Sequence, residues 1–321
     1  MTALLPSILK RKIVPKVWGG RALETVLGIE LPPGELVGET WELYDRPDGS
    51  SPVRGTDLTV HDLLQRNRVE LLGVGVEPTR EGRFPLALKF LDAAQVLSVQ
   101  VHPDDEQAER DGDSGKPEAW VVLHAGAGAR ILRGFHRGVT RESFEAVAAD
   151  QRVTELLESF VPTVGDCISL PPGTVHTLGP DVVVLEIQYN SGITYRLYDW
   201  GRDRELHVEQ GIEAARFGLE PETVSESSPT ADGGEWLVRN SSFSMRRYTI
   251  GEPRAVATEG SFKVLTMLAG RAMVGWKSQG EHDPLQVGPA ESVLIPACTD
   301  EVFVSPVGEV SAVVSGPGVA S

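Results

Sequence analysis

The chain has 321 residues, of which 40% are hydrophobic and 24% charged, and its formal net charge is −16. This length allows one large domain or two ordinary ones, and the composition is typical of a globular protein. The acidic charge argues against nucleic acid or an anionic membrane as the main partner, because both select basic surfaces, but a locally basic pocket could still bind a phosphorylated small molecule.

The amino-terminal segment MTALLPSILKRKIV has neither the apolar length nor the charge order of a secretory signal. No apolar run approaches the roughly 20 residues that would span a bilayer. The two cysteines, Cys167 and Cys298, lie far apart and outside any CxxC spacing, so they indicate neither a thiolate metal site nor a disulfide framework. We therefore expect a cytoplasmic protein.

Glycine and proline separate many short runs of β-branched residues, which predicts a mainly β protein, a sandwich or barrel. Helices are expected in fewer places, where apolar residues recur at helical spacing or a capping residue precedes them. The expected helices are 58–73, a pair within 140–160 that starts at Thr140, and 207–219. The expected strands include WVVLHAG, DCISLPPG, DVVVLEIQ, FKVLTMLAG, RAMVGW, ESVLIPA and VSAVVSG.

Two parts of the sequence resemble each other. DCISLPPGTVH (166–176) aligns without a gap with ESVLIPACTDE (291–301), and EAWVVLHAG (118–126) aligns with FKVLTMLAG (262–270). The alignment predicts two related β-domains, 1–221 with a helical insert near 140–160, and 236–321, joined by a polar linker at 222–235. Because Glu301 and Phe262 stand where the first copy has His176 and Glu118, we expect the second domain to be degenerate and structural.

The run LSVQVHPDDEQA (97–108) begins as a strand and stops at Pro103. In a strand, alternate residues share a face, so Ser98, Gln100 and His102 would project together. The acidic residues 104–106 that follow are interpreted as a solvated strand end.

Further candidate ligands lie at two other strand boundaries. Glu118 follows a Gly-Lys-Pro turn in GKPEAW, and His176 follows a Pro-Pro-Gly turn in PPGTVH. Two imidazoles, one carboxylate and the Gln100 amide would suit zinc, and also iron(II), manganese or nickel. By spacing alone, a single buried histidine is more often a hydrogen-bonded core residue than a metal ligand.

QVHPDD, GKPEAW, PPGTVHTLG and EIQYNSGITYRLYDWGR together resemble the type I mannose-6-phosphate isomerases, which are metal-dependent cupins. The resemblance extends from WGG (18–20) and GETWEL (38–43) through PLALKFLDA (85–93) to LHVEQ (206–210), in the family's order. It implies two cupin-like β-barrel or jelly-roll domains, with a few helices packed on the amino-terminal one.

The resemblance also implies a reaction and its residues. The metal ligands would be Gln100, His102, Glu118 and His176, holding one Zn²⁺ per chain, although another divalent metal is possible. The reaction would interconvert D-mannose 6-phosphate and D-fructose 6-phosphate through an enediol. Arg196 would stabilise the negative charge of the enediolate and cannot be the base, because a guanidinium does not lose its proton in proteins.

Other roles follow from alternation and family position. Glu186, in VVVLEIQ, is the first candidate for the base that transfers the proton, and Lys116 is the second. Lys89, Ser98 and Arg202 are expected to bind the phosphate.

One position departs from the family pattern: the family usually reads NSDITYR, and this chain reads NSGITYR, with Gly192. The loss of the acidic residue leaves open how firmly Arg196 is held and whether the substrate differs.

Two other functions stay open. A non-haem-iron cupin oxygenase also uses two histidines and a carboxylate, but it would not need the basic residues. A non-catalytic cupin that binds a sugar phosphate is the other alternative. The sequence gives no oligomeric state.

Overall fold

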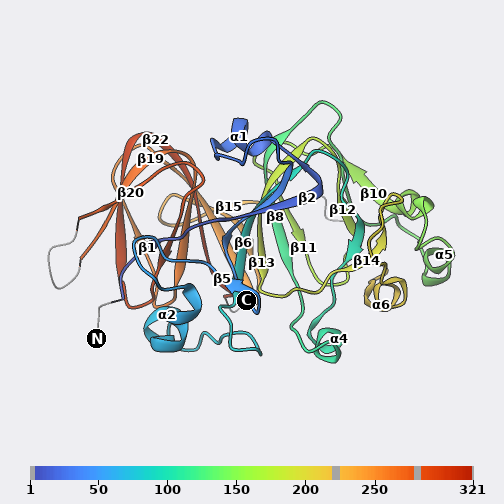
Figure 1. The fold of residues 1–321 in the computed structure, drawn as a ribbon, viewed down its shortest axis with the longest axis horizontal. Helices are drawn as coiled ribbons and strands as arrows, with labels where there is room; N and C mark the ends of the chain where they lie inside the picture. Colours follow the sequence, from blue (N-terminus) through green and yellow to red (C-terminus); the bar gives the residue numbers. More distant parts are fainter. Residues whose placement is uncertain (1–3, 219–224, 278–282, 320–321) are drawn as a thin grey trace.

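The computed structural model describes residues 4–218, 225–277 and 283–319. Within them the chain is mainly β, as predicted, and every strand pair in its large sheets is antiparallel, as in β4 with β5 (Figure 1). Hydrogen bonds between described strands form open sheets and do not close a continuous barrel. No helix in the described part of the chain is long and apolar enough to cross a membrane.

The amino-terminal two-thirds of the chain form two sheets. The inner sheet has the order β11-β8-β13-β6-β3-β2, and the outer sheet has the order β10-β9-β12-β7-β14. The inner strands are β2 (Lys12–Gly20), β3 (Val37–Leu43), β6 (Leu86–Ala93), β8 (Glu118–Ala125), β11 (Cys167–Leu170) and β13 (Val182–Tyr189). The outer strands are β7 (Val99–Val101), β9 (Ile131–Phe135), β10 (Leu157–Phe160), β12 (His176–Leu178) and β14 (Tyr195–Tyr198). A short hairpin follows β3, with strands β4 (Asp45–Arg46) and β5 (Gly49–Ser50).

A third, C-terminal sheet has the order β1-β21-β19-β22-β17-β16-β15, with β18 also paired to β22 and β20 to β19. Its strands are β1 (Ser7–Ile8), β15 (Ser228–Pro229), β16 (Glu235–Arg239), β17 (Phe243–Ile250), β18 (Arg254–Ala257), β19 (Lys263–Trp276), β20 (Leu285–Val287), β21 (Ser292–Ile295) and β22 (Glu301–Pro317). In Figure 1 the dark blue β1 lies among these orange and red strands. The amino-terminal segment therefore completes the C-terminal sheet.

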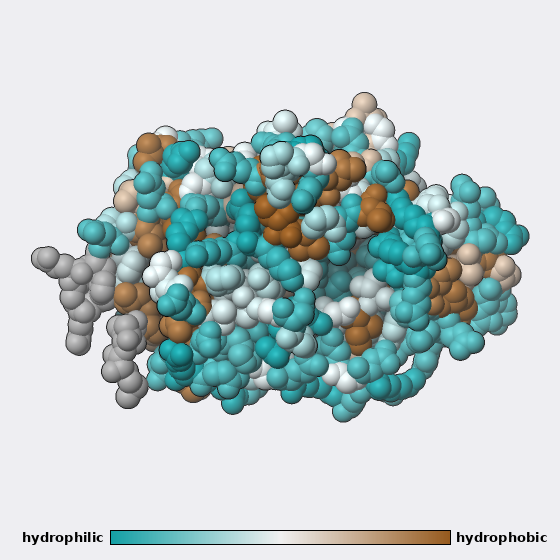
Figure 2. Space-filling view, in the orientation of Figure 1, coloured by the Kyte–Doolittle hydropathy of each residue, from teal (hydrophilic) through white to brown (hydrophobic). Residues whose placement is uncertain are grey.

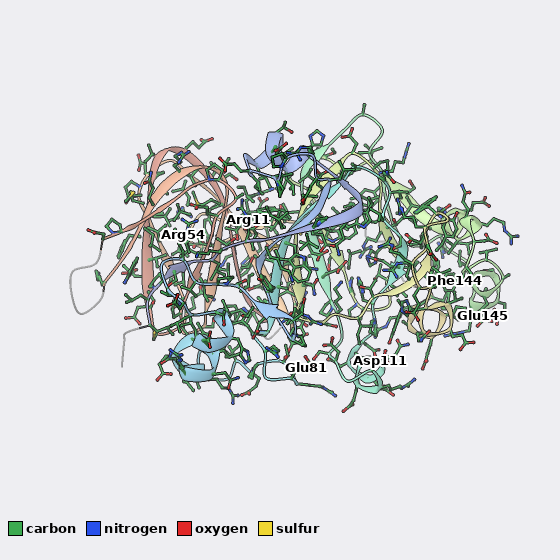
Figure 3. The ribbon with its side chains drawn as sticks, viewed as in Figure 1. Arg11, Arg54, Glu81, Asp111, Phe144 and Glu145 are labelled. Atoms are coloured by element: carbon green, nitrogen blue, oxygen red, sulfur yellow. The ribbon has the colours of Figure 1, made fainter. Side chains whose placement is uncertain are left out.

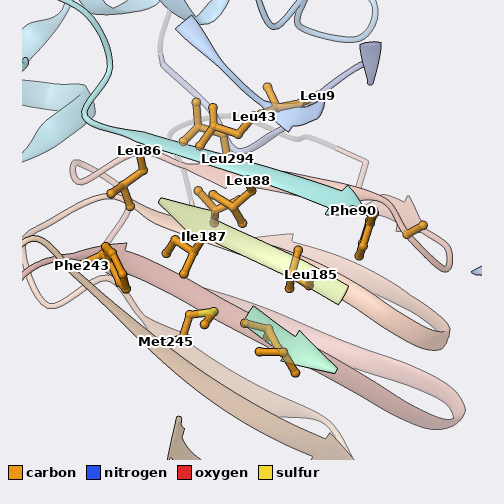
Figure 4. Close-up of a cluster of buried hydrophobic side chains, with 14 of the residues drawn as sticks. Leu9, Leu43, Leu86, Leu88, Phe90, Leu185, Ile187, Phe243, Met245 and Leu294 are labelled. Carbon is orange, nitrogen blue, oxygen red and sulfur yellow. The ribbon is translucent and has the colours of Figure 1, made fainter. Parts of the chain in front are cut away.

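The inner sheet is buried between the other two. Along β13, Leu185 and Ile187 point to one face and Glu186 and Gln188 to the other, because side chains alternate along a strand. Figure 4 shows the apolar face of β6 and β13 packed against side chains of the C-terminal sheet. The buried residues that join the two parts include Leu88, Phe90, Leu185, Ile187, Phe243, Met245, Phe262 and Leu294. The polar face is left free to build a site.

Polar contacts also join the amino-terminal part of the chain to the C-terminal sheet. They are made by Arg11 and Arg54, which Figure 3 labels. The Arg11 guanidinium donates to the Ala290 carbonyl at 2.5 Å and pairs with the buried Glu42. Arg54 pairs with Glu291. The two parts are thus attached through charged as well as apolar contacts.

The helices are short. They are α1 (Ala22–Leu27), α2 (Val60–Arg66), α3 (Arg68–Leu72), α4 (Asp105–Arg110), α5 (Arg141–Glu145) and α6 (Val208–Ala214), with a 3₁₀ helix η1 (Gln151–Leu156). The helix expected at 58–73 is divided into α2 and α3 at Asn67. The carbonyls of Leu71 and Leu72, left free at the end of α3, accept from the amides of Ala297 and Phe262. Helix α3 therefore contacts the C-terminal part, whereas α5 and α6 lie beside the outer sheet in Figure 1.

Two local expectations were wrong in detail. Thr140 does cap α5, but the expected second helix within 140–160 is the 3₁₀ helix η1, and the segment ends in strand β10, paired with β9. The acidic run 104–106 starts helix α4 and does not end a strand: the Asp104 carboxylate accepts from the Gln107 amide as an N-cap.

The aligned segments of the two parts form equivalent antiparallel strand pairs. Strand β8 pairs with β11 and β13, and β19 pairs with β21 and β22, although the register differs by one residue. The Thr174 amide donates to the Pro171 carbonyl at 3.1 Å, and at the aligned positions the Thr299 amide donates to the Pro296 carbonyl at 3.0 Å.

We keep the division into domains 1–221 and 236–321 as a proposal. Residues 222–224 of the expected linker lie outside the described residues, and its remainder contains the short strand β15.

The two thiols differ in environment, which predicts their reactivity. Burial raises the pKa of Cys167 to about 12, while Cys298 is exposed. The thiolate is the nucleophile, so iodoacetamide at pH 8 should modify Cys298 and spare Cys167 until the protein unfolds. Mass spectrometry of the native and the urea-unfolded protein should show one and two modified thiols. Rapid modification of two thiols in the native state would contradict the burial of Cys167. In the control variant Cys298→Ser, the native protein should have no modified thiol.

Candidate active site

Three buried side chains converge where the inner and outer sheets meet. His102 follows β7, Glu118 begins β8 and His176 begins β12. Their donor atoms all lie within 4.8 Å of one another, and they form the His/Cys/Asp/Glu group in the described part of the chain that could hold a metal ion. Nε2 of His102 is 3.3 Å from Glu118 Oε2, and Nε2 of His176 is 3.3 Å from Glu118 Oε1.

Backbone carbonyls fix the orientation of both imidazoles. Nδ1 of His102 lies 3.0 Å from the Ile193 carbonyl, and Nδ1 of His176 lies 2.9 Å from the Thr174 carbonyl. A carbonyl can only accept, so each Nδ1 carries the proton and each neutral Nε2 presents a lone pair to the centre. Burial lowers the pKa of His102 to about 4, and the nearby Lys116 ammonium acts in the same direction. This tautomer is the one that metal-binding histidines use.

The carboxylate between the imidazoles also fits a cation. Both Glu118 oxygens are buried and accept no well-formed hydrogen bond, although Lys116 Nζ lies 3.2 Å from Oε2 as an ion pair. Burial alone would raise the pKa of Glu118, but Lys116 and His102 hold it well below its usual range. A buried ionised carboxylate needs a positive partner, and two imidazole nitrogens with one carboxylate oxygen suit a divalent metal ion.

Gln100 lies beside the triad. Its Nε2 is 3.2 Å from Nε2 of His176, and its Oε1 accepts from Ser98 Oγ at 3.3 Å. The strand pairing places Gln100 between His176 on β12 and Arg196 on β14. Ser98, Gln100 and His102 alternate with apolar residues as predicted, and their polar side chains follow one another along one face of β7.

A cavity of about 300 Å³ is lined by residues of the inner and outer sheets. Two of them, Gln100 and Lys116, also contact the triad. Nζ of Lys116 is 3.3 Å from His102 Nε2 and 3.2 Å from Glu118 Oε2. The predicted site residues that line the cavity are Lys89, Ser98, Gln100, Lys116, Glu186 and Arg196. The sequence therefore identified residues from both sheets that meet around one space.

Glu186 is held by neighbours on both sides. Its Oε1 accepts from Lys89 Nζ at 3.0 Å and its Oε2 accepts from Trp120 Nε1 at 3.0 Å. Lys89 also donates to Gln188 at 2.6 Å. Burial would lower the pKa of Lys89, but Glu186 and Glu39 beside it raise it above its usual value. Glu186 and Lys89 therefore form a buried ion pair on the cavity wall.

Arg196 has few partners of its own. Nη1 donates to the Glu205 carbonyl at 2.7 Å, while its buried Nε has no hydrogen-bond partner. Burial lowers the pKa of Arg196, and the neighbouring guanidinium of Arg204 lowers it further. Two guanidinium groups side by side favour an anion between or beside them.

Arg202 does not line the cavity. Its guanidinium contacts Asp199 at 3.3 Å, the Gln95 side chain at 3.1 Å and the Val96 carbonyl at 2.9 Å. Arg204 lines the cavity instead, held by two hydrogen bonds of 2.6 Å to the buried Asp199.

Several cavity residues were missed by the sequence reasoning. They are Lys16, Trp18, Glu39, Trp41, Tyr44, Arg46, Asn190 and Arg204. Glu39 and Trp41 are two residues apart in GETWEL, so strand alternation could have predicted that they share one face. The others come from segments whose position depends on long-range strand pairing.

The fold and the triad define a class, the metal-binding cupin-type β proteins whose site lies between two sheets. Residues 8–124 match the model of the family described as phosphomannose isomerase type I, catalytic domain. A mannose-6-phosphate isomerase of Streptococcus mutans is 32% identical over 84% of this chain and 86% of its own length. The Bacillus subtilis mannose-6-phosphate isomerase ManA is also 32% identical, over 83% and 86%.

The structure agrees with these matches. The crystal structure of the mannose 6-phosphate isomerase from Bacillus subtilis superposes with a TM-score of 0.86 at 27% identity, covering 97% of this chain and 99% of that one. The chain belongs to the type I mannose-6-phosphate isomerase family.

Proposed function

We propose that the protein is a metal-dependent aldose–ketose isomerase that interconverts D-mannose 6-phosphate and D-fructose 6-phosphate. The observation that carries the proposal is the buried triad of His102, Glu118 and His176 next to a predominantly cationic cavity. Family membership supports the same activity. A cytoplasmic location, in keeping with the unpaired thiols Cys167 and Cys298, remains part of the proposal.

The triad would hold the metal, with Gln100 as a fourth ligand and Zn²⁺ as the ion we favour. A turn of the Gln100 amide would exchange its oxygen and nitrogen and present the oxygen to the triad. When bound, a divalent ion supplies Lewis acidity to the hydroxyl and carbonyl oxygens of the sugar.

The charge of the cavity supports an anionic substrate. Six cationic residues line it and only two acidic ones, Glu39 and Glu186; the cationic residues are Lys16, Arg46, Lys89, Lys116, Arg196 and Arg204. This excess contrasts with the net charge of −16 for the whole chain. We assign the phosphate to Ser98 and Arg204, with Lys89 nearby. Arg204 replaces the predicted Arg202, because Arg204 lines the cavity and Arg202 does not.

The isomerisation moves one proton from C2 to C1 of the sugar, and the O2 proton is lost as O1 gains one. The base must reach the carbon next to the metal-binding end, and Lys116 contacts the triad directly whereas Glu186 has both oxygens engaged. We therefore place Lys116 before Glu186 as the group that transfers the proton. Arg196 would stabilise the enediolate charge from the side of β14.

A coupled assay for fructose 6-phosphate formed from mannose 6-phosphate tests the activity. We expect turnover to disappear on dialysis against a chelator and to return with zinc, with metal analysis showing one ion per chain. A protein that binds one zinc and does not turn over mannose 6-phosphate would contradict the proposal.

A further inference from the structure

The side chain of Arg46 extends from the β4–β5 hairpin across the loop that joins β13 to β14. Nη1 donates to the Asn190 carbonyl at 3.2 Å, and Nη2 lies 3.5 Å from Asp113 Oδ2. Arg46 and Gly192 both line the cavity. The hairpin therefore brings a guanidinium to a loop that lies 144 residues away in sequence at Asn190.

Gly192 leaves the space that this guanidinium occupies. A Cβ added at Gly192 would lie 2.1 Å from Arg46 Nη2 and 3.1 Å from its Cζ, far closer than real contacts. The backbone at Gly192 is not in the left-handed region, so its conformation does not call for glycine; the missing side chain leaves room for the end of the flexible Arg46 side chain. The motif NSDITYR of the family that this chain resembles has an acidic residue at this position. In this chain the guanidinium of Arg46 lies at this point of the cavity wall.

The nearest carboxylate oxygen is farther from Arg46 than from most of the other cationic residues that line the cavity. Lys16, Lys89 and Arg204 each have a carboxylate oxygen within 3.2 Å. The oxygen of Asp113 nearest Arg46 is at 3.5 Å, and it already accepts from the Gly192 amide at 2.8 Å. Among the described residues, the contacts of Arg46 use Nη1 and Nη2 and leave Nε without a partner.

We propose that Arg46 is a substrate-binding residue of this chain, whose guanidinium donates to an oxygen of the sugar phosphate from the space above Gly192. The inference rests on the proposed function and adds a residue that determines affinity for the anionic substrate. Guanidinium groups bind phosphate and hydroxyl oxygens through several N–H donors in a fixed plane, which suits this position.

A purely structural role for Arg46 would give a different result from direct substrate binding. The neighbouring Ile193 carbonyl accepts from His102, and Asp113 precedes the turn that carries Lys116. If Arg46 only fastened these loops, its removal would lower metal content and thermal stability. Direct substrate binding would change KM and leave both unaltered.

The test is a cycle of variants assayed with mannose 6-phosphate. Arg46→Gln should raise KM about 10- to 100-fold, since a hydrogen bond to a charged group is lost, while kcat changes less than about threefold. Gly192→Ala should displace Arg46 and raise KM by a similar factor. The double variant should be no worse than Arg46→Gln by more than about twofold, because both changes remove one interaction.

Gly128→Ala is the matched control, because Gly128 is exposed and a Cβ there meets no atom within 4 Å. A KM within twofold of wild type for Arg46→Gln, additive effects in the double variant, or a loss of zinc that accounts for the change in KM would each overturn the proposal. If the wild-type protein has no turnover, the proposed function fails separately. Calorimetric titration of mannose 6-phosphate into wild type and Arg46→Gln then still tests Arg46, and titration of inorganic phosphate shows whether the phosphate group is its ligand.

Discussion

Glu118→Gln is expected to lose the bound metal and to lower kcat by about 1,000-fold or more, since Lewis-acid stabilisation of this kind supplies several kcal/mol. The substitution keeps the shape of the side chain and removes the negative charge that lies between His102 and His176. It also leaves the buried Lys116 ammonium without its carboxylate partner. Zinc content and the coupled isomerase assay measure the two effects, and we expect the melting temperature to fall as well.

Glu158→Gln provides the matched control. Glu158 also pairs with a histidine, His136, at 2.7 Å, but this pair is on the surface. An exposed pair of this kind contributes about 0–1 kcal/mol, so metal content, kcat and melting temperature should remain near wild type. If Glu118→Gln kept both its zinc and its turnover, the triad would not be the metal site.

The residues of the triad were candidates because strand alternation and turns are local signals, and the resemblance to the family selected them from the other polar residues. Strand alternation puts Gln100 and His102 on one face, and a Pro-Pro-Gly turn delivers His176 to the start of its strand. Gly173 in this turn has a φ of +84°, where a side chain would be strained and would meet Arg216. These constraints act over a few residues and are visible in the sequence.

Other parts of the site depend on tertiary structure that the sequence does not reveal. Trp41 reaches the cavity because β3 pairs with β6 in the register that sets it opposite Lys89. The chain turns sharply after β14, where Trp200 and Gly201 both have positive φ. That turn puts Arg204, and not the predicted Arg202, on the cavity wall. The last residues of the helical segment expected at 140–160 form strand β10, because pairing with β9 outweighs local helix propensity.

Lys116→Met is expected to lower kcat by about 10²- to 10⁴-fold while zinc stays bound, because general-base catalysis contributes factors of this size. Methionine has nearly the length of lysine and removes the amine that lies 3.3 Å from His102. Proton transfer should then limit turnover fully, so the deuterium isotope effect with substrate labelled at C2 should rise above the wild-type value. Glu186→Gln should cost about tenfold or less, because Glu186 acts through its contacts with Lys89 and Trp120.

Lys277→Met is the control for this substitution, since Lys277 is exposed and pairs with Glu301 at 3.6 Å outside the cavity. The comparison of the two cavity variants decides which group is the base, because only the true base should combine a large loss of kcat with an increased isotope effect. If Glu186→Gln shows that combination and Lys116→Met stays within tenfold of wild type, the proton is transferred by the carboxylate. Lys116 would then serve to balance the charge of Glu118, a role that its 3.2 Å contact with the carboxylate already allows.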